Sequence, residues 1–175
     1  MRFALIASLL VLGAPAAAQD LSAFGTGPVF EDFGPHAPVE GANELPSLAR
    51  FSIAFDVAKK AEDGANGTSA HNRGFESAAR FINMHVAAGV PADRIKIAVV
   101  VHGGAVRDLV ESGDNGSAAM LRAMLDYGVR FIVCGQSAAA NGVSADELID
   151  GVEMELSAMT AHALLQQDGY TVNPF

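Results

Sequence analysis

The sequence IKIAVVV at residues 95–101 is the feature that most constrains the fold. Nearly all of these residues are apolar, most are β-branched, and apolar and polar positions do not alternate. Such a run is typical of a central strand in a parallel sheet, because helices cover both faces of that sheet and leave no polar face. The run therefore predicts an α/β fold in which helices connect parallel strands.

Strand and helix patterns alternate along the rest of the chain. Further strands are expected at residues 51–57, 129–134, 152–156 and 170–175. Helices are expected at residues 72–88, at 105–110, around Met120 to Leu125, after the Ser144 to Glu147 capping box, and at 157–167. Strands separated by helices predict a three-layer, flavodoxin-like fold, in which helices cover both faces of a five-stranded, mostly parallel sheet.

The first 18 residues predict a secretory signal peptide. They combine Arg2, an apolar run as far as Gly13 and the small residues 16–18, after which we expect cleavage. The apolar run is shorter than the roughly 20 residues that a membrane-spanning helix needs. We therefore expect a periplasmic or secreted protein that has no membrane contact once the signal is removed.

Residues 19–48 predict an irregular N-terminal arm. They contain four of the seven prolines and four glycines, and neither a strand period nor a helix period runs through them. Phe24, Phe30 or Phe33 would anchor this arm on the domain surface or on a neighbouring subunit. The packed domain is expected at residues 49–175, because a chain of 175 residues that is 50% hydrophobic can bury one core.

The charge of the chain argues against one class of partner. The formal net charge is −9 and no basic cluster is present, so we expect no binding to nucleic acid. Removal of residues 1–18 takes away Arg2 and leaves the protein more acidic still. Cys134 is the only cysteine, so it cannot form a disulfide within the chain even in an oxidising compartment.

Chemistry-bearing residues follow the expected strands. Asp56 lies near the end of the first strand, His102 follows the central strand, and Cys134 ends the strand at 129–134. Because the carboxyl ends of parallel strands meet at one edge, these three side chains are expected to converge. A nearby imidazole and the N–H groups of residues 135–137, which are expected to form a turn, would favour the thiolate.

Each of these residues also has a structural interpretation. Cys134 can be a buried core residue, and His102 can hydrogen-bond a loop carbonyl. Gly103 and Gly104 can form an anion-binding nest, although no nucleotide-binding motif surrounds them. His71 is expected in a loop, and His85 and His162 on helices as core or surface residues. No metal-ligand spacing accompanies Cys134, so no metal and no cofactor are expected.

Five segments resemble the DsrE/DsrF-like family, which includes sulfur-relay subunits and the YchN-like α/β proteins. They are residues 55–57 (FDV), 80–83 (RFIN), 100–105 (VVHGGA), 133–137 (VCGQS) with Gly142 and Val143, and 164–170 (LLQQDGY). In relay members a cysteine after the corresponding strand accepts a persulfide and passes its outer sulfur to a partner, and Cys134 matches that position. The resemblance also implies a subunit of a homo-oligomer or hetero-oligomer.

These observations lead to one expected function and two alternatives. We expect an exported sulfur carrier or sulfurtransferase in which Cys134 carries the persulfide, His102 orients it, and a donor or acceptor protein supplies or removes sulfur. Residues expected to line the substrate site are Asp56, Asn83, Gly103, Gly104, Gly135 and Gln136. The alternatives are a non-catalytic module that binds a small ligand or metal, and a cysteine hydrolase that uses Cys134, His102 and Asp56.

Overall fold

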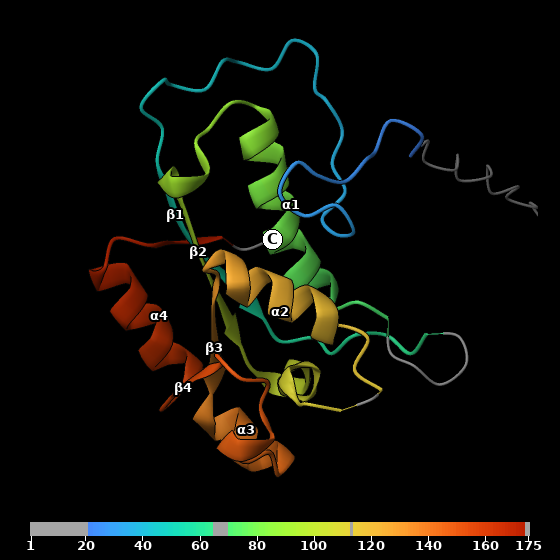
Figure 1. Ribbon diagram of the computed structural model, residues 1–175. Helices are drawn as coiled ribbons and strands as arrows, with labels where there is room; N and C mark the ends of the chain where they lie inside the picture. Colours follow the sequence, from blue (N-terminus) through green and yellow to red (C-terminus); the bar gives the residue numbers. More distant parts are fainter. Residues whose placement is uncertain (1–20, 65–69, 113, 174–175) are drawn as a thin grey trace, which may run out of the picture.

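The central apolar run forms the middle strand of a five-stranded sheet in the computed structural model, which describes residues 21–64, 70–112 and 114–173 (Figure 1). The strands are β1 (Phe51–Val57), β2 (Ile95–Val101), β3 (Arg130–Cys134), β4 (Glu153–Glu155) and β5 (Thr171–Asn173). They are arranged in the order β4-β3-β2-β1-β5, and every pair is parallel. The predicted α/β sheet is therefore confirmed. The signal peptide predicted at residues 1–18 lies outside the described residues.

Helices cover both faces of the sheet, as the sequence predicts (Figure 1). The helices are α1 (Arg73–Ala87), α2 (Ala118–Tyr127), α3 (Gly135–Asn141) and α4 (Ala158–Gln167), with 3₁₀ segments at Ala92–Arg94, Gly103–Leu109 and Ala145–Glu147. Helices α1 and α2 lie over one face, and α4 lies over the other. None of the helices in the described part of the chain is long and apolar enough to cross a membrane.

The pleat of the strands divides the core into two parts. Side chains such as Val99 and Phe131 pack with α1 and α2 in the larger part. The smaller part joins four strand residues to two residues of α4, namely Ala54, Ala98, Val100, Ile132, Ala161 and Leu165. Because successive side chains of a strand point to opposite faces, this smaller set defines the face that α4 covers.

Local signals explain where several helices begin and end. Asn72 caps α1 by accepting hydrogen bonds from the backbone N–H groups of Gly74 and Phe75. Gly128 ends α2 in the left-handed conformation, with φ of 102°. The expected turn at residues 135–137 is wrong, because α3 begins at Gly135 and Cys134 is its N-cap residue. The chain therefore enters a helix directly from β3.

The arm that precedes β1 has no strand or helix among its described residues, only an isolated bridge between Gly25 and His36. Phe30 is buried and packs edge-on against Tyr127 of α2, while Phe33 packs against the same core and Phe24 is exposed. Two of the three expected anchors therefore hold the arm on the α1 and α2 side of the domain.

Candidate functional site

Asp56, His102 and Cys134 all point toward the face of the sheet that α4 covers. Asp56 pairs in register with Val100, and Val100 pairs with Ile132, so the three predicted residues continue the rows of the α4-facing residues. The backbone N–H of His102 donates to the carbonyl of Val57 at 2.9 Å, which extends the ladder by one residue. The predicted convergence at one sheet edge is thus a consequence of the parallel register.

The thiol of Cys134 lies where two helices begin. The backbone N–H of Ser137 in α3 donates to Sγ at 3.4 Å, and the N–H groups of Gln136 and of Ala158, the first residue of α4, contribute to lowering the pKa of the thiol. Burial raises the pKa of the Cys134 thiol, but hydrogen bonds from Ser137, Ala158 and Gln136 outweigh burial and hold that pKa below its ordinary value. The residue is only 5% exposed, so the thiolate is stabilised in a narrow, mostly covered place.

Ser137 connects this thiol to the loop that follows β2. Its hydroxyl hydrogen-bonds Sγ, and its Oγ accepts the backbone N–H of Gly103 at 3.0 Å. Asn141, one turn further along α3, donates to the carbonyl of Gly103 at 3.2 Å. In the sequence analysis, the N–H of Gly103 was a candidate for binding an anion. In the structure this N–H is already hydrogen-bonded to Ser137.

Asp56 and His102 form a hydrogen-bonded pair at the same edge of the sheet as Cys134. Nε2 of His102 lies 3.1 Å from Oδ2 of Asp56, and Nε2 of His162 in α4 lies 2.7 Å from Oδ1. Partial burial raises the pKa of Asp56, but the hydrogen bonds from His162 and His102 outweigh it and lower that pKa. Among the described residues the thiol of Cys134 has a hydrogen bond from Ser137 and none from His102, so the structure does not show the effect on the thiol that the sequence suggested for a nearby imidazole.

The three glycines of the predicted site allow close approach of neighbouring backbone. A Cβ atom on Gly135 would lie 2.9 Å from the carbonyl oxygen of Glu155, and one on Gly103, where φ is +55°, would lie 3.0 Å from that of Ala58. Gly104 has more room, with 3.6 Å to Lys60. Their role in the structure is thus to let the loops after β1 and β4 pack against the segments that hold His102 and Cys134.

The two remaining predicted site residues differ in location. Gln136 is exposed beside the thiol, and its amide reaches the carbonyl of Leu156 at 3.4 Å. Asn83 lies on α1, on the opposite face of the sheet, and is fully buried. Its amide binds only backbone groups of the arm, in residues 29–34. The structure therefore brings Gln136 to Cys134 and leaves Asn83 apart from the site.

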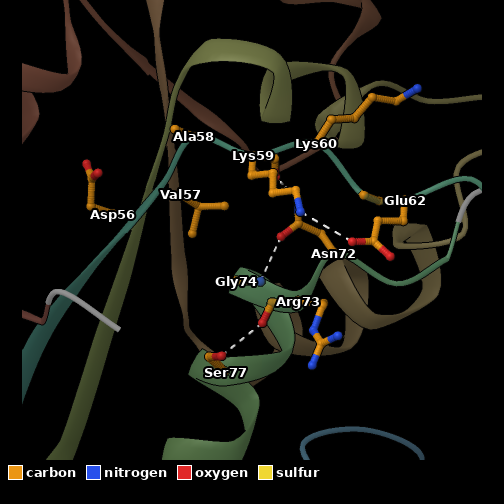
Figure 2. A pocket seen from close by; sticks show the side chains of 11 residues that line it. Asp56, Val57, Ala58, Lys59, Lys60, Glu62, Asn72, Arg73, Gly74 and Ser77 are labelled. Carbon is orange, nitrogen blue, oxygen red and sulfur yellow. Dashed lines mark hydrogen bonds and ion pairs between the residues drawn. The ribbon is translucent and has the colours of Figure 1, made fainter. Parts of the chain in front are cut away.

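A cavity of about 280 Å³ adjoins the site without being part of it. Lys59, Lys60 and Arg73 are among its lining residues, and Asp56 is the one candidate site residue that borders it. Figure 2 shows the carboxylate of Asp56 on the other side of the strand from Val57 and the two lysines. In the described part of the chain, no group of three or more His, Cys, Asp or Glu side chains is arranged to hold a metal ion.

His162, Ala158 and the hydroxyl of Ser137 are the parts of the site that the sequence interpretation did not identify, whereas the N–H groups of residues 135–137 were expected to favour the thiolate. His162 was expected to be a core or surface residue, and it lies 106 positions from Asp56 in sequence. One signal was available, because Ala161 and Leu165 form the buried stripe of α4 and His162 directly follows the first of them. Once α4 is known to cover this face of the sheet, His162 is a natural partner for a strand-end residue.

Comparison with known proteins places the domain among proteins of one family. The model of the DsrE/DsrF-like family matches residues 53–174. Among solved structures, a protein of unknown function from Methanobacterium thermoautotrophicum, MTH1491, is 20% identical with a TM-score of 0.50, and the ychN protein from E. coli is 19% identical with the same score. Each match covers 71% of this chain and 99% of the other. No curated protein matches the sequence.

Proposed function

Because the chain belongs to the DsrE/DsrF-like family, we propose that it is a sulfur carrier in which Cys134 accepts a sulfur atom from a persulfide and passes it on. The observations that carry this proposal are the hydrogen bond that the backbone N–H of Ser137 donates to the thiol at 3.4 Å and the lowered pKa of that thiol. They favour the thiolate, which is the form of cysteine that attacks sulfur.

The transfer step needs one reactant besides the protein, a donor persulfide of the form R–S–SH. The thiolate of Cys134 attacks the outer sulfur, the S–S bond of the donor breaks, and its electron pair leaves with the inner sulfur as R–S⁻. Cys134 then carries S–SH, and R–S⁻ takes a proton from His102 or from water. Cys134 is only 5% exposed, so the donor must present its terminal sulfur to reach Sγ.

Location and assembly belong to the same proposal. The signal-like residues 1–18 support export to the periplasm, where the sulfur donor and acceptor would be exported proteins or small sulfur compounds. The resemblance to relay subunits supports assembly into a homo-oligomer. The membrane and nucleic acid are not proposed as partners.

Mass spectrometry of the intact protein tests the proposal. The mature protein, purified without reductant, is measured before and after incubation with a low-molecular-weight persulfide, and again after dithiothreitol. We expect an addition of about one sulfur mass that dithiothreitol removes and that Cys134→Ser abolishes. If the wild-type mass does not change while the thiol can be alkylated, Cys134 is accessible but does not accept sulfur, and the proposal is wrong.

The hydrogen bond between Asp56 and His102 supports a second candidate, a cysteine hydrolase, because hydrolases orient their general base with a carboxylate. A burst of acylation by an activated ester, dependent on Cys134 and His102, would favour this activity over sulfur transfer. The observed hydrogen bonds of the thiol favour the carrier, since none of them is donated by His102.

A further inference from the structure

The carboxylate of Asp56 is shared between two imidazole rings. Oδ2 faces Nε2 of His102 at 3.1 Å, and Oδ1 faces Nε2 of His162 at 2.7 Å. The three residues come from β1, the end of β2 and α4, so they meet only in the folded protein. Both carboxylate oxygens of Asp56 are thus hydrogen-bonded to histidines. This argues against the expectation that Asp56 binds substrate directly.

We propose that Asp56 and His162 are a positioning pair, which holds His102 in the tautomer with the proton on Nε2 and with Nδ1 open to the site. Asp56 then acts through His102 rather than on substrate. His162 acts one step further away, because its hydrogen bond to Oδ1 fixes the rotation of the carboxylate and so aims Oδ2 at His102.

The protons follow from what each group can donate. An ionised carboxylate only accepts hydrogen bonds, so Nε2 of each histidine must carry a proton. The hydrogen bonds that lower the pKa of Asp56 keep it ionised near neutral pH. In the neutral form of each ring, Nδ1 is then unprotonated. This assignment fits His162, whose Nδ1 is buried without a partner among the described residues, since a proton there would have no acceptor.

The two rings differ in their access to solvent. The side chain of His162 is 18% exposed, whereas that of His102 is 32% exposed. Nδ1 of His102 has no hydrogen-bond partner among the described residues, and the greater exposure of this ring favours its contact with solvent. His102 therefore presents a single, defined nitrogen that can exchange a proton with a bound molecule.

The assignment of the tautomer follows from the hydrogen bonds around Asp56 and does not depend on the proposed function, whereas its catalytic use rests on that function. During sulfur transfer, Nδ1 of His102 takes up a proton from water, and the imidazolium passes this proton to the departing R–S⁻. The ring thereby returns to the neutral Nε2–H form. The positioning pair keeps the hydrogen bond to Asp56 unchanged throughout this exchange.

The test is nitrogen NMR of the imidazole rings in the full mature chain, in wild type, His162→Leu, His162→Gln and Asp56→Asn. In wild type we expect His102 as the Nε2–H tautomer. His162→Leu and Asp56→Asn should give a mixture of tautomers, whereas His162→Gln, whose amide can still donate to Oδ1, should retain the wild-type state. His71→Gln changes an exposed loop residue and serves as the matched control.

A second readout separates this inference from the proposed function. Sulfur transfer to Cys134 is timed in the same variants, and we expect His162→Leu to slow it about fivefold and His162→Gln to restore most of the rate, as for the loss and recovery of one hydrogen bond. A wild-type His102 with its proton on Nδ1, or unchanged His102 signals in a folded His162→Leu, would overturn the positioning role. Absence of sulfur transfer in wild type with the expected tautomer would instead refute only the proposed function.

Discussion

Replacement of Ser137 by alanine tests whether hydrogen bonds activate the thiol. The Ser137 hydroxyl hydrogen-bonds Sγ of Cys134, and its oxygen accepts the N–H of Gly103 at 3.0 Å. The change removes the hydroxyl and leaves the backbone N–H of residue 137 in place. A hydrogen bond to a charged group contributes about 1.5 kcal/mol, and about 1.4 kcal/mol corresponds to a tenfold change in an equilibrium. We therefore expect roughly tenfold less thiolate at neutral pH.

The assay is the rate of alkylation of Cys134 by a small reagent as a function of pH, followed by intact mass. Ser137→Ala should react about tenfold more slowly than wild type near neutral pH and approach the wild-type rate at high pH, where both thiols are ionised. Ser77→Ala is the matched control, because the Ser77 hydroxyl bonds a carbonyl of α1 and lies far from the thiol in sequence and on another helix. Identical pH profiles for Ser137→Ala and wild type would refute the reasoning.

Three further predictions follow from contacts already described. Gly135→Ala should lower stability by about 1–3 kcal/mol in urea unfolding, because the new Cβ meets the carbonyl of Glu155 at 2.9 Å, whereas Gly25→Ala, with nothing within 4 Å, should change it little. Asn83→Ala should cost about 2–4 kcal/mol and make the arm sensitive to protease, since buried backbone groups lose their partners; a wild-type cleavage pattern would contradict this. Since the folded protein lowers the pKa of Asp56 below 3.8, the stabilisation from this residue is present above that pH and is lost as pH falls further. Asp56→Asn should therefore flatten the acid limb of the stability curve, and an unchanged limb would count against this contribution.

Sequence patterns predict the part of the site that depends on the strands. Asp56, His102 and Cys134 could be assigned to one sheet edge because parallel strands place their carboxyl ends together, whatever the details of packing. His162 could not be assigned, since its contact with Asp56 depends on how α4 rotates over the sheet. The helical start at Gly135 was missed for a related reason: glycine and serine favour turns, and the capping role of Cys134 outweighs that preference here.

Asn83 illustrates the same limit on the other face of the sheet. Helical periodicity assigns a residue to a side of its helix, but it does not reveal which distant segment covers that side. The polar side of α1 is partly covered by the arm, so Asn83, which the sequence analysis expected to line the substrate site, is fully buried against the arm instead.

The hydrogen bonds between Asn83 and the arm also show that the region of family similarity and the packed structure begin at different residues. Similarity to the family begins at residue 53, but the packed part of the structure extends upstream at least to Val29, whose backbone N–H donates to the Asn83 side chain at 3.1 Å. A protein trimmed to the region of similarity would lose the edge-on contact of Phe30 with Tyr127 and leave the Asn83 amide without its five protein contacts. Residues 29–34 therefore pack as part of the core, although they lie outside the region that is similar to the family.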